Sequence, residues 1–594
     1  MMDGTKRMLM LVAAVLGAAC VLGDEARPTG FRPPPCRTKI IRTGGLKSAK
    51  RLRATALPPS WDSRDHGWIT SVKDQNPFGT CWTFAANAII ETQLLKAGRG
   101  VWDLSEKNMT MLCGFEGDWN SGGTFDMAAA YLLRWGGAVA ETNDVYRYDE
   151  GAWNAHPSLP LDPALHIQNV VWIPALDGTE EARNALKAAI MEYGAVGASC
   201  CWLSTGENGS AYYYKGSANE NHAVAVVGWD DSYSTNNFRA SSRPPENGAW
   251  LIKNSWGTHS GENGFWHVSY CDTKFGKWES PVFVPATAEE DYTGVYGYDR
   301  LGLLSDIGME NDSFQIQAAL FTSAWNEELA AVGVWSAIEE NPYTITIYTN
   351  VLRGGTSPIE GGAAALTQRG VLTHAGYTTI HLEQPVALPN TKGFAVVYEQ
   401  TGGATSHYVN YSSPDYTITD HQAGQTWLGQ HRSAFGDITW TDLTKFYGIP
   451  KSCICLKAYT RTTVAARVDD APGEAESGTA ALAALAATNT AAYAQYGETF
   501  GAFANIVGAN GRTLWASWLA GLDPANPSDH ALSVSIAVSN DVPSLSWTPD
   551  LGDARTYTIW GRRDFSPTNG WEALSENALG ATPHRFFKVS VSQP

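Results

Sequence analysis

The sequence predicts an α+β domain of two lobes, then an all-β sandwich or jelly-roll-like domain, then a small, mostly β C-terminal module. Three observations lead to this fold class. Residues 57–288 contain one strong helical pattern followed by strand patterns. Residues 289–465 are nearly all strand-like, with turn clusters between alternating apolar and polar residues. Residues 489–594 begin with a helical pattern and end in short strands, and the acidic, then Ala-rich stretch 466–488 predicts a linker before them.

Length and charge narrow the class of protein. A chain of 594 residues corresponds to about four domains at roughly 150 residues each. With 44% apolar residues and a formal net charge of −18, it is expected to be a folded, acidic protein. No stripe of Lys and Arg is present that would neutralise phosphates, so we expect no nucleic-acid partner.

The N-terminal residues predict secretion. Residues 1–23 carry Lys6 and Arg7 and then an uncharged run too short to span a bilayer, which is typical of a signal peptide. No later run is apolar enough to predict a transmembrane segment. Residues 24–56 hold nine Lys and Arg against two acidic residues, and three consecutive prolines break any helix there. This segment is either a short basic propeptide or a linker.

The first domain begins with the strongest helical pattern of the chain. Thr80 is expected to cap a helix that starts at Cys81 and stops at Gly98. We expect one apolar face on this helix, formed by Trp82, Ala85, Ala86 and Ile89. Further along, residues 222–228, 250–255 and 265–270 predict antiparallel strands.

In the second domain the run from Tyr343 to Tyr348 alternates between apolar and polar residues, as a half-buried strand does. Four tryptophans of this domain could stack on a sugar: Trp325, Trp335, Trp427 and Trp440. Tryptophans of β-sandwiches are more often part of the core, so we expect these in the core.

Four residues of the first domain form a candidate catalytic set. Cys81 stands at the first turn of the predicted helix, where free backbone N–H groups favour a thiolate. His222 could take the proton of this thiol, and Asn254 could hold the imidazole in position. Gln75 and the Cys81 N–H could donate hydrogen bonds to an oxyanion. This pattern indicates nucleophilic attack by sulfur on a carbonyl carbon.

The motifs around these residues resemble the papain family of cysteine peptidases over about residues 57–285. The matching stretches are Asp74 to Ala85, Leu104 to Asn108, Gly122-Gly123, Asn221 to Val224 and Lys253 to Gly257. The resemblance implies a two-lobed catalytic domain that hydrolyses peptide bonds. By that resemblance Cys81 is the nucleophile, His222 the acid and base, Asn254 the residue that orients His222, and Gln75 the oxyanion donor.

The same resemblance implies substrate-binding residues. Gly122 and Gly123 would let a substrate backbone lie close to the enzyme, and Trp256 would shield the bond between His222 and Asn254 from water. Phe125 would shape the pocket for the second residue before the scissile bond, although an ordinary core position is an equal alternative.

Residues 293–463 resemble the lectin-like domain that follows papain-type catalytic domains in some secreted bacterial proteins. The resemblance rests on short stretches such as Tyr296 to Asp299 and Cys455 to Tyr459. It implies a glycan or cell-surface ligand for the second domain. The zinc motif His-Glu-x-x-His and the phosphate-binding loop are absent from the sequence, so we expect no metal and no cofactor.

The sequence therefore predicts a secreted, bacterial cysteine endopeptidase, extracellular, periplasmic or associated with the cell surface, that acts on proteins or peptides through a thioester intermediate. Two alternatives stay open. One is a surface adhesin whose papain-like scaffold is inert and which binds glycans, and the other is an acyl transferase that uses the same residues.

Overall fold

The computed structural model describes residues 27–33, most of residues 57–462, and five strands between residues 533 and 592. Within 57–462 the gaps are 156–157, 159–160, 162, 288–289, 291, 309–315, 324–326, 389–391, 401–405, 411–420, 432–437 and 446–451. The predicted signal peptide, residues 34–56, the linker 466–488 and the helical pattern from 489 onward lie outside the described residues, as does Trp325.

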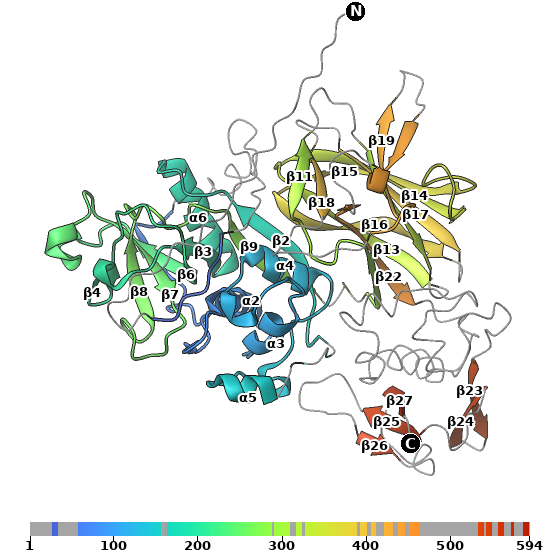
Figure 1. Ribbon diagram of the computed structural model, residues 1–594, viewed down its shortest axis with the longest axis horizontal. Helices are drawn as coiled ribbons and strands as arrows, with labels where there is room; N and C mark the ends of the chain where they lie inside the picture. Colours follow the sequence, from blue (N-terminus) through green and yellow to red (C-terminus); the bar gives the residue numbers. More distant parts are fainter. Residues whose placement is uncertain are drawn as a thin grey trace, which may run out of the picture.

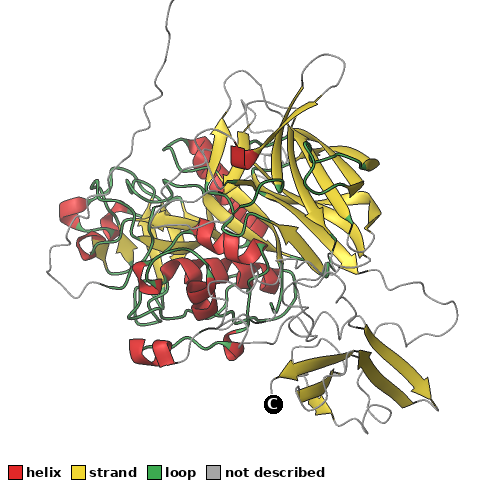
Figure 2. Ribbon diagram, turned by 45° about the vertical axis from the view of Figure 1, so that its right-hand side comes forward, coloured by secondary structure: helices red, strands yellow, loops and turns green. Residues whose placement is uncertain are grey.

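The first domain combines a sheet with a group of helices (Figures 1 and 2). The sheet has the strand order β1-β6-β7-β8-β5-β4, and β3 pairs with β6 as well. Its strands are β1 (Ser60–Asp62), β3 (Val196–Cys200), β4 (Glu207–Asn208), β5 (Ala211–Tyr212), β6 (His222–Asp230), β7 (Ala249–Lys253) and β8 (Phe265–Ser269). The helices are α2 (Cys81–Lys96), α3 (Glu106–Leu112), α4 (Phe125–Leu133), α5 (Glu150–Ala155) and α6 (Glu180–Tyr193). The predicted antiparallel order of β6, β7 and β8 is confirmed.

Helix α2 starts at Cys81 as predicted, and Gly98 follows its end with φ of +69°, a backbone conformation that favours glycine. The expectation of a single apolar face is wrong. Every residue up to Thr92 is buried, because α2 lies between α3, α4 and α6 on its helical side and β6 and β9 on its strand side. The capping role expected of Thr80 is also wrong, since its hydroxyl bonds to the Tyr146 hydroxyl at 2.8 Å instead of to the helix backbone.

The second domain is a β-sandwich of two six-stranded sheets with a third, small sheet (Figure 2). One large sheet contains β15 (Ala363–Leu372), β14 (Asn341–Val351), β17 (Gly393–Gln400), β12 (Ile316–Thr322), β19 (Thr426–His431) and β20 (Ile438–Asp442). The small sheet contains β11 (Ser305–Gly308), β18 (Ser406–Asn410) and β21 (Cys453–Ile454). In β14 the side chains of Tyr343, Ile345 and Ile347 are buried and those between them are half-buried, as the alternation predicts.

The other large sheet of the sandwich includes strands of the first domain. Its order is β10 (Gly294–Gly297), β22 (Leu456–Thr462), β13 (Glu327–Ser336), β16 (Gly376–Leu388), β2 (Ile167–Ile173) and β9 (Ser280–Pro285). Strands β2 and β9 belong to the first domain, and β2 pairs with β16 through Val170 and Val171. One sheet therefore runs through both domains, and β2 and β9 lie between them in Figure 1.

The hydrophobic core also crosses the boundary between the two domains. Ile345 and Val332, from the two large sheets, meet in the core inside the sandwich. On the opposite face of β13, β16 and β22, Trp335, Tyr377 and Tyr459 belong to the same hydrophobic cluster as Trp82 of α2. The shared sheet is thus covered on one side by the sandwich partner and on the other by the first domain.

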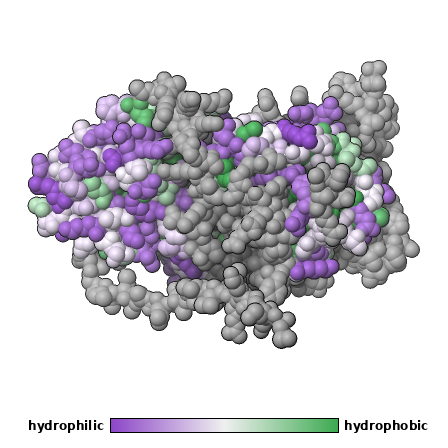
Figure 3. Space-filling view, turned by 90° about the horizontal axis from the view of Figure 1, so that it is seen from above, coloured by the Kyte–Doolittle hydropathy of each residue, from purple (hydrophilic) through white to green (hydrophobic). Residues whose placement is uncertain are grey.

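The described part of the C-terminal module contains two small sheets. In the C-terminal module, β23 (Ser533–Ser539) pairs with β24 (Val542–Thr548), and β25 (Thr556–Arg562) lies between β26 (Glu572–Leu574) and β27 (Phe586–Ser592). The described surface visible in Figure 3 is mostly hydrophilic, with small scattered apolar areas. Among the described residues, no helix has the length and apolar character needed to cross a membrane.

Candidate functional site

The fold places Cys81 where the start of α2 meets the start of β6. Cys81 is the first residue of α2 and is fully buried, and its Sγ accepts a hydrogen bond from the Ala223 backbone N–H at 3.3 Å. Burial raises the pKa of the Cys81 thiol to about 12, against the opposing effect of the backbone N–H groups of Ala223, Trp82 and Cys81 itself. The helix start alone does not produce a thiolate here, because burial has the larger effect.

His222 and Asn254 lie side by side on neighbouring strands. His222 opens β6 and Asn254 follows the last residue of β7, so the pairing of these strands sets their distance. The His222 Nε2 and Asn254 Oδ1 are 2.8 Å apart, and Oδ1 also accepts from the Ser255 N–H at 2.8 Å. Because Oδ1 accepts, Nε2 donates, and the buried Nδ1 keeps its lone pair. Nδ1 has no hydrogen-bond partner in the described part of the chain.

Three causes act on the charge of His222. Burial lowers its pKa to about 4, and the positive charge of Arg27 acts in the same direction, while the bond to Asn254 raises it. The Trp256 indole stacks on the imidazole with ring centroids 4.4 Å apart and an angle of 15°. Trp256 is itself buried, and its ring covers one face of the imidazole.

Gln75 is held in one orientation by its neighbours. The Ser255 hydroxyl donates to Gln75 Oε1 at 2.6 Å, which leaves Nε2 as the donor on the other side. Nε2 donates to the Phe78 carbonyl at 2.9 Å and to the Thr29 carbonyl at 3.2 Å. The Tyr146 hydroxyl donates to the Gln75 backbone carbonyl at 2.7 Å.

Ser255 and Tyr146 are therefore part of the site, although sequence reasoning gave neither of them a role in it. Ser255 stands inside the Lys-Asn-Ser-Trp-Gly motif, so its position next to Asn254 was a usable signal. Tyr146 lies 71 residues from Gln75, and its role follows only from the folded chain.

The glycine pair lies where another stretch of backbone approaches closely. A Cβ on Gly122 would come within 2.3 Å of the Gly30 carbonyl oxygen, and a Cβ on Gly123 within 2.5 Å of the Trp82 ring. Phe125 opens α4 and is buried, with its ring 6.1 Å from that of Phe31. Phe125 therefore belongs to the hydrophobic core. Its ring also lies beside Phe31, which is part of residues 27–33, described next.

Residues 27–33, called the strap below, lie across this site. Gly123 donates to the Gly30 carbonyl at 2.8 Å and accepts from the Arg32 N–H at 2.9 Å, so the strap runs parallel to the chain at Gly123 in an isolated β-bridge. The Asn221 carbonyl accepts from the N–H groups of Gly30 and Phe31 at 2.9 and 2.8 Å. At the other end, Trp256 Nε1 donates to the Pro28 carbonyl at 2.7 Å. The strap thus covers Cys81 and occupies the Gln75 amide.

Comparisons with known proteins identify both domains. The model of the papain family cysteine proteases matches residues 57–284, and the model of a lectin like domain matches residues 295–460. The chain has a papain-family domain followed by a lectin-like domain. Its papain-family domain is 30% identical to vignain of Phaseolus vulgaris over 36% of this chain and 54% of that protein. It is also 30% identical to cysteine proteinase 15A of Pisum sativum, over 38% of this chain and 64% of that protein. The matches thus span less than two thirds of these relatives.

A solved structure shares the two-domain fold. It contains the cysteine protease and lectin-like domains of Cwp84, a surface layer associated protein of Clostridium difficile. The TM-score is 0.60 with 24% sequence identity, covering 74% of this chain and 94% of that one. At this identity the likeness concerns the fold, and it confirms the predicted papain-like domain followed by a β domain.

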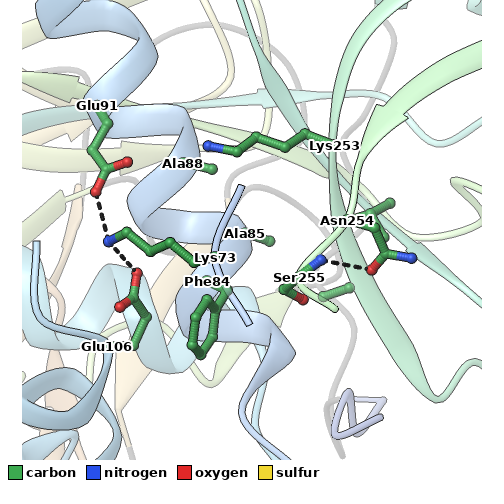
Figure 4. A pocket seen from close by; sticks show the side chains of 11 residues that line it. Lys73, Phe84, Ala85, Ala88, Glu91, Glu106, Lys253, Asn254 and Ser255 are labelled. Atoms are coloured by element: carbon green, nitrogen blue, oxygen red, sulfur yellow. Dashed lines mark hydrogen bonds and ion pairs between the residues drawn. The ribbon is translucent and has the colours of Figure 1, made fainter. Parts of the chain in front are cut away.

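Behind the site, the papain-family domain contains a buried group of charges. Figure 4 shows Lys73 between Glu91 and Glu106, with its Nζ 2.9 Å from a carboxylate oxygen of each. Lys253, next to Asn254 in sequence, donates to the Thr70 hydroxyl at 2.9 Å, and that hydroxyl donates to Glu91 at 2.7 Å. Burial lowers the pKa of Lys253 to about 8, although Glu91 raises it. This charge network fixes β7 against α2, and so Asn254 against Cys81.

A metal site would need several ligating side chains in one place. Among the described residues, no group of three or more His, Cys, Asp and Glu side chains is arranged to hold a metal ion. In the lectin-like domain Trp335 and Trp427 are buried, as expected of core residues, and Trp440 is half-buried against the cluster that contains Trp427.

Proposed function

We propose that the chain is a secreted cysteine endopeptidase that hydrolyses peptide bonds through Cys81, His222 and Asn254. The observation that carries the proposal is the orientation of His222. Its Nε2 is committed to Asn254 at 2.8 Å, its Nδ1 has no hydrogen-bond partner among the described residues, and the N–H of the next residue, Ala223, donates to Cys81 Sγ at 3.3 Å. A base with one nitrogen fixed and the other free beside a thiol is the arrangement that activates a cysteine.

The chemistry follows from these positions. Nδ1 of His222 takes the thiol proton, and the Cys81 thiolate attacks the carbonyl carbon of the substrate. Gln75 Nε2 and the Cys81 N–H donate to the oxyanion. The C–N bond then breaks, His222 gives its proton to the leaving amine, and the acyl half stays on sulfur as a thioester. Water attacks this thioester, His222 accepts the water proton, and the acid and the free thiol are released.

The position of the strap supports a propeptide role for residues 24–56 over a linker role. The strap runs from Trp256 beside His222 to Gly123. A substrate with its acyl half along Gly123 and its leaving half at His222 would run in the opposite direction. The strap thus covers Cys81 without offering a peptide bond in the direction of attack. We infer that the peptidase is active only after the strap has left the site.

The test uses the full chain with a recognition sequence for a site-specific protease inserted between residues 34 and 56. After cleavage by that protease, the cut chain should hydrolyse casein, and Cys81→Ala should lower the rate by at least about 10⁴-fold because no other group replaces the sulfur nucleophile. Ser199→Ala, at a buried hydroxyl without a hydrogen-bond partner in the described residues, serves as the control. Hydrolysis that persists in the Cys81→Ala chain would refute the proposal.

Three finer parts of the proposal have their own measurements. Secretion rests on residues 1–23, and the N-terminal sequence of the protein collected from the culture medium should begin near Asp24 or further downstream. A glycan ligand rests on the lectin-like domain, and binding of the full-length Cys81→Ala chain to a glycan array tests it. Mass spectra of products formed with an added amine distinguish hydrolysis from acyl transfer.

A further inference from the structure

Arg27 of the strap lies in a site that surrounds its side chain on several sides. Its guanidinium carbon is 5.1 Å from the Trp256 ring centroid and 5.4 Å from that of Trp266. One guanidinium nitrogen donates to the Ser260 hydroxyl at 2.5 Å, and another lies 3.4 Å from a Glu207 carboxylate oxygen. We call Glu207, Trp256, Ser260 and Trp266 the guanidinium site.

The residues of the guanidinium site also make contacts within the catalytic domain, in addition to those with Arg27. The second carboxylate oxygen of Glu207 accepts from Trp202 Nε1 at 2.8 Å. The Trp202 ring also meets the edges of Trp256 and Trp266, each at 5.1 Å between centroids. Both of these tryptophans are buried. When the strap leaves, the two indoles and the carboxylate keep their positions and a place for a cation is open.

The charges around the site favour a cation. The Glu207 side chain is 17% exposed, so its attraction for a positive group is only partly screened. Arg239 donates to the backbone carbonyls of Glu207 and Ser204 and is not paired with the Glu207 carboxylate. A planar guanidinium can face an indole ring while its N–H groups reach Ser260 and Glu207, whereas a lysine ammonium has no such plane.

The position of the site relative to the reacting atoms sets which half of a substrate it meets. Gln75 Nε2 donates to the Thr29 carbonyl, which marks the oxyanion position. Arg27 lies two residues from Thr29, on the side where Trp256 stacks on His222. In the proposed function His222 protonates the leaving amine, so Arg27 lies on the side of the site that binds the leaving half of the substrate. Gly123, on the opposite side, pairs with Gly30 and Arg32.

We propose that the guanidinium site selects an arginine side chain, one or two residues after the scissile bond, and that Glu207 supplies the selection by charge. This inference rests on the proposed peptidase function and specifies its substrate class. Arg27 then has two roles at different times, since it fills the site in the covered chain and is replaced there by the arginine of a substrate. Lysine would bind more weakly because it lacks the planar contact with the indoles.

The experiment uses the cut chain and quenched fluorescent peptides that differ only in the first or second residue after the scissile bond. The residues compared are arginine, lysine, glutamate and citrulline, which has the shape of arginine without its charge. For the wild type we expect kcat/KM about tenfold higher with arginine than with citrulline, and lowest with glutamate. Glu207→Gln keeps an oxygen for Trp202 and should bring the arginine-to-citrulline ratio to about one.

Glu246→Gln is the matched control. Glu246 is an exposed carboxylate that pairs with Arg183, away from the strap, and its loss should leave the ratio unchanged. Equal rates for arginine and citrulline in the wild type overturn the inference without any variant and leave the peptidase in place. If a folded Glu207→Gln chain still cleaves the arginine peptide faster than the citrulline peptide, the role of Glu207 is overturned. If the wild type cleaves no peptide at all, the peptidase function fails and the selection fails with it.

Discussion

At the residue scale, the main feature of the site is that its two reactive groups are both neutral while the strap is in place. Burial raises the pKa of Cys81 to about 12 and lowers that of His222 to about 4. Between these values the thiol keeps its proton and the imidazole stays uncharged. The charge of Arg27 adds to this effect on His222. Departure of the strap would remove that charge and admit water, and both changes favour the thiolate and imidazolium pair.

The difference between the covered site, where Cys81 is a neutral thiol, and the uncovered site predicts how fast Cys81 reacts with iodoacetamide. With a pKa of about 12, roughly one Cys81 in 10⁵ is a thiolate at pH 7. In the uncut chain we expect slow alkylation whose rate rises about tenfold per pH unit up to pH 11, since only the thiolate reacts. In the cut chain the reaction should be fast and nearly independent of pH around neutrality. Mass spectrometry of the labelled peptide measures both rates.

Cys271 provides the internal control for this labelling. It is a free cysteine, partly exposed, in the same domain. Its alkylation should not change when the chain is cut. Equal rates at Cys81 before and after cutting would contradict the view that the strap holds the thiol protonated.

At the scale of elements, the buried charge network joins helix α2 to strand β7. Lys73 interacts with Glu91 and Glu106, whose side chains are 1% and 2% exposed. Burial alone would lower the pKa of Lys73, but Glu106, Glu91 and the exposed Asp103, 2.7 Å away, together raise it, so this lysine stays charged. Glu91 in turn accepts from the Leu104 N–H and from Thr70, which links the network to the loop before α3.

Removal of the central cation should therefore be costly. Lys73→Met removes the direct ion-pair partner of two buried carboxylates, and we expect the free energy of unfolding to fall by about 3–5 kcal/mol. Arg183→Met, which breaks the exposed pair with Glu246, should cost less than about 1 kcal/mol. The midpoints of urea unfolding of the uncut chain compare the two variants. Equal midpoints would show that the buried network contributes no more than an exposed pair.

The sequence was sufficient to predict the elements that carry chemistry but not the contacts that hold them. Cys81, His222 and Asn254 stand in local motifs at a helix start and at strand ends, so their neighbours in sequence identify them. The strap was seen only as a basic, proline-containing segment, because its partners lie far away in sequence: Gly123 and Asn221 are about 90 and 190 residues from it. The all-round burial of α2 also depends on packing against distant elements, which periodicity cannot predict.

At the scale of the whole molecule, the lectin-like domain and the papain-family domain are joined by structure as well as by chain. The Tyr377 and Tyr459 hydroxyls bond at 2.8 Å within the cluster that also contains α2. Across the boundary, the Thr379 N–H donates to Asn169 Oδ1 at 2.8 Å, and Arg134 donates to the Arg300 carbonyl at 3.0 Å. The boundary predicted near residue 288 follows from local patterns, which do not indicate that β2, besides pairing with β9, pairs with β16 more than 200 residues later.

A chain that ends at residue 288 should therefore fail to form a stable catalytic domain. It would keep β2 and β9 but lose β16, and with it the strand that satisfies the outer backbone groups of β2 at Val170 and Val171. It would also lose Trp335, Tyr377 and Tyr459 from the shared cluster and expose the apolar residues they cover. A chain that ends at residue 465 keeps all of these contacts and is the matched control. We expect the shorter chain to be insoluble, or to unfold at least about 10 °C below the longer one in a thermal scan, because one core of this kind unfolds as a unit. A soluble chain 1–288 with the same unfolding temperature and, once cut, the same casein hydrolysis would show instead that the shared sheet is a contact between two independent domains.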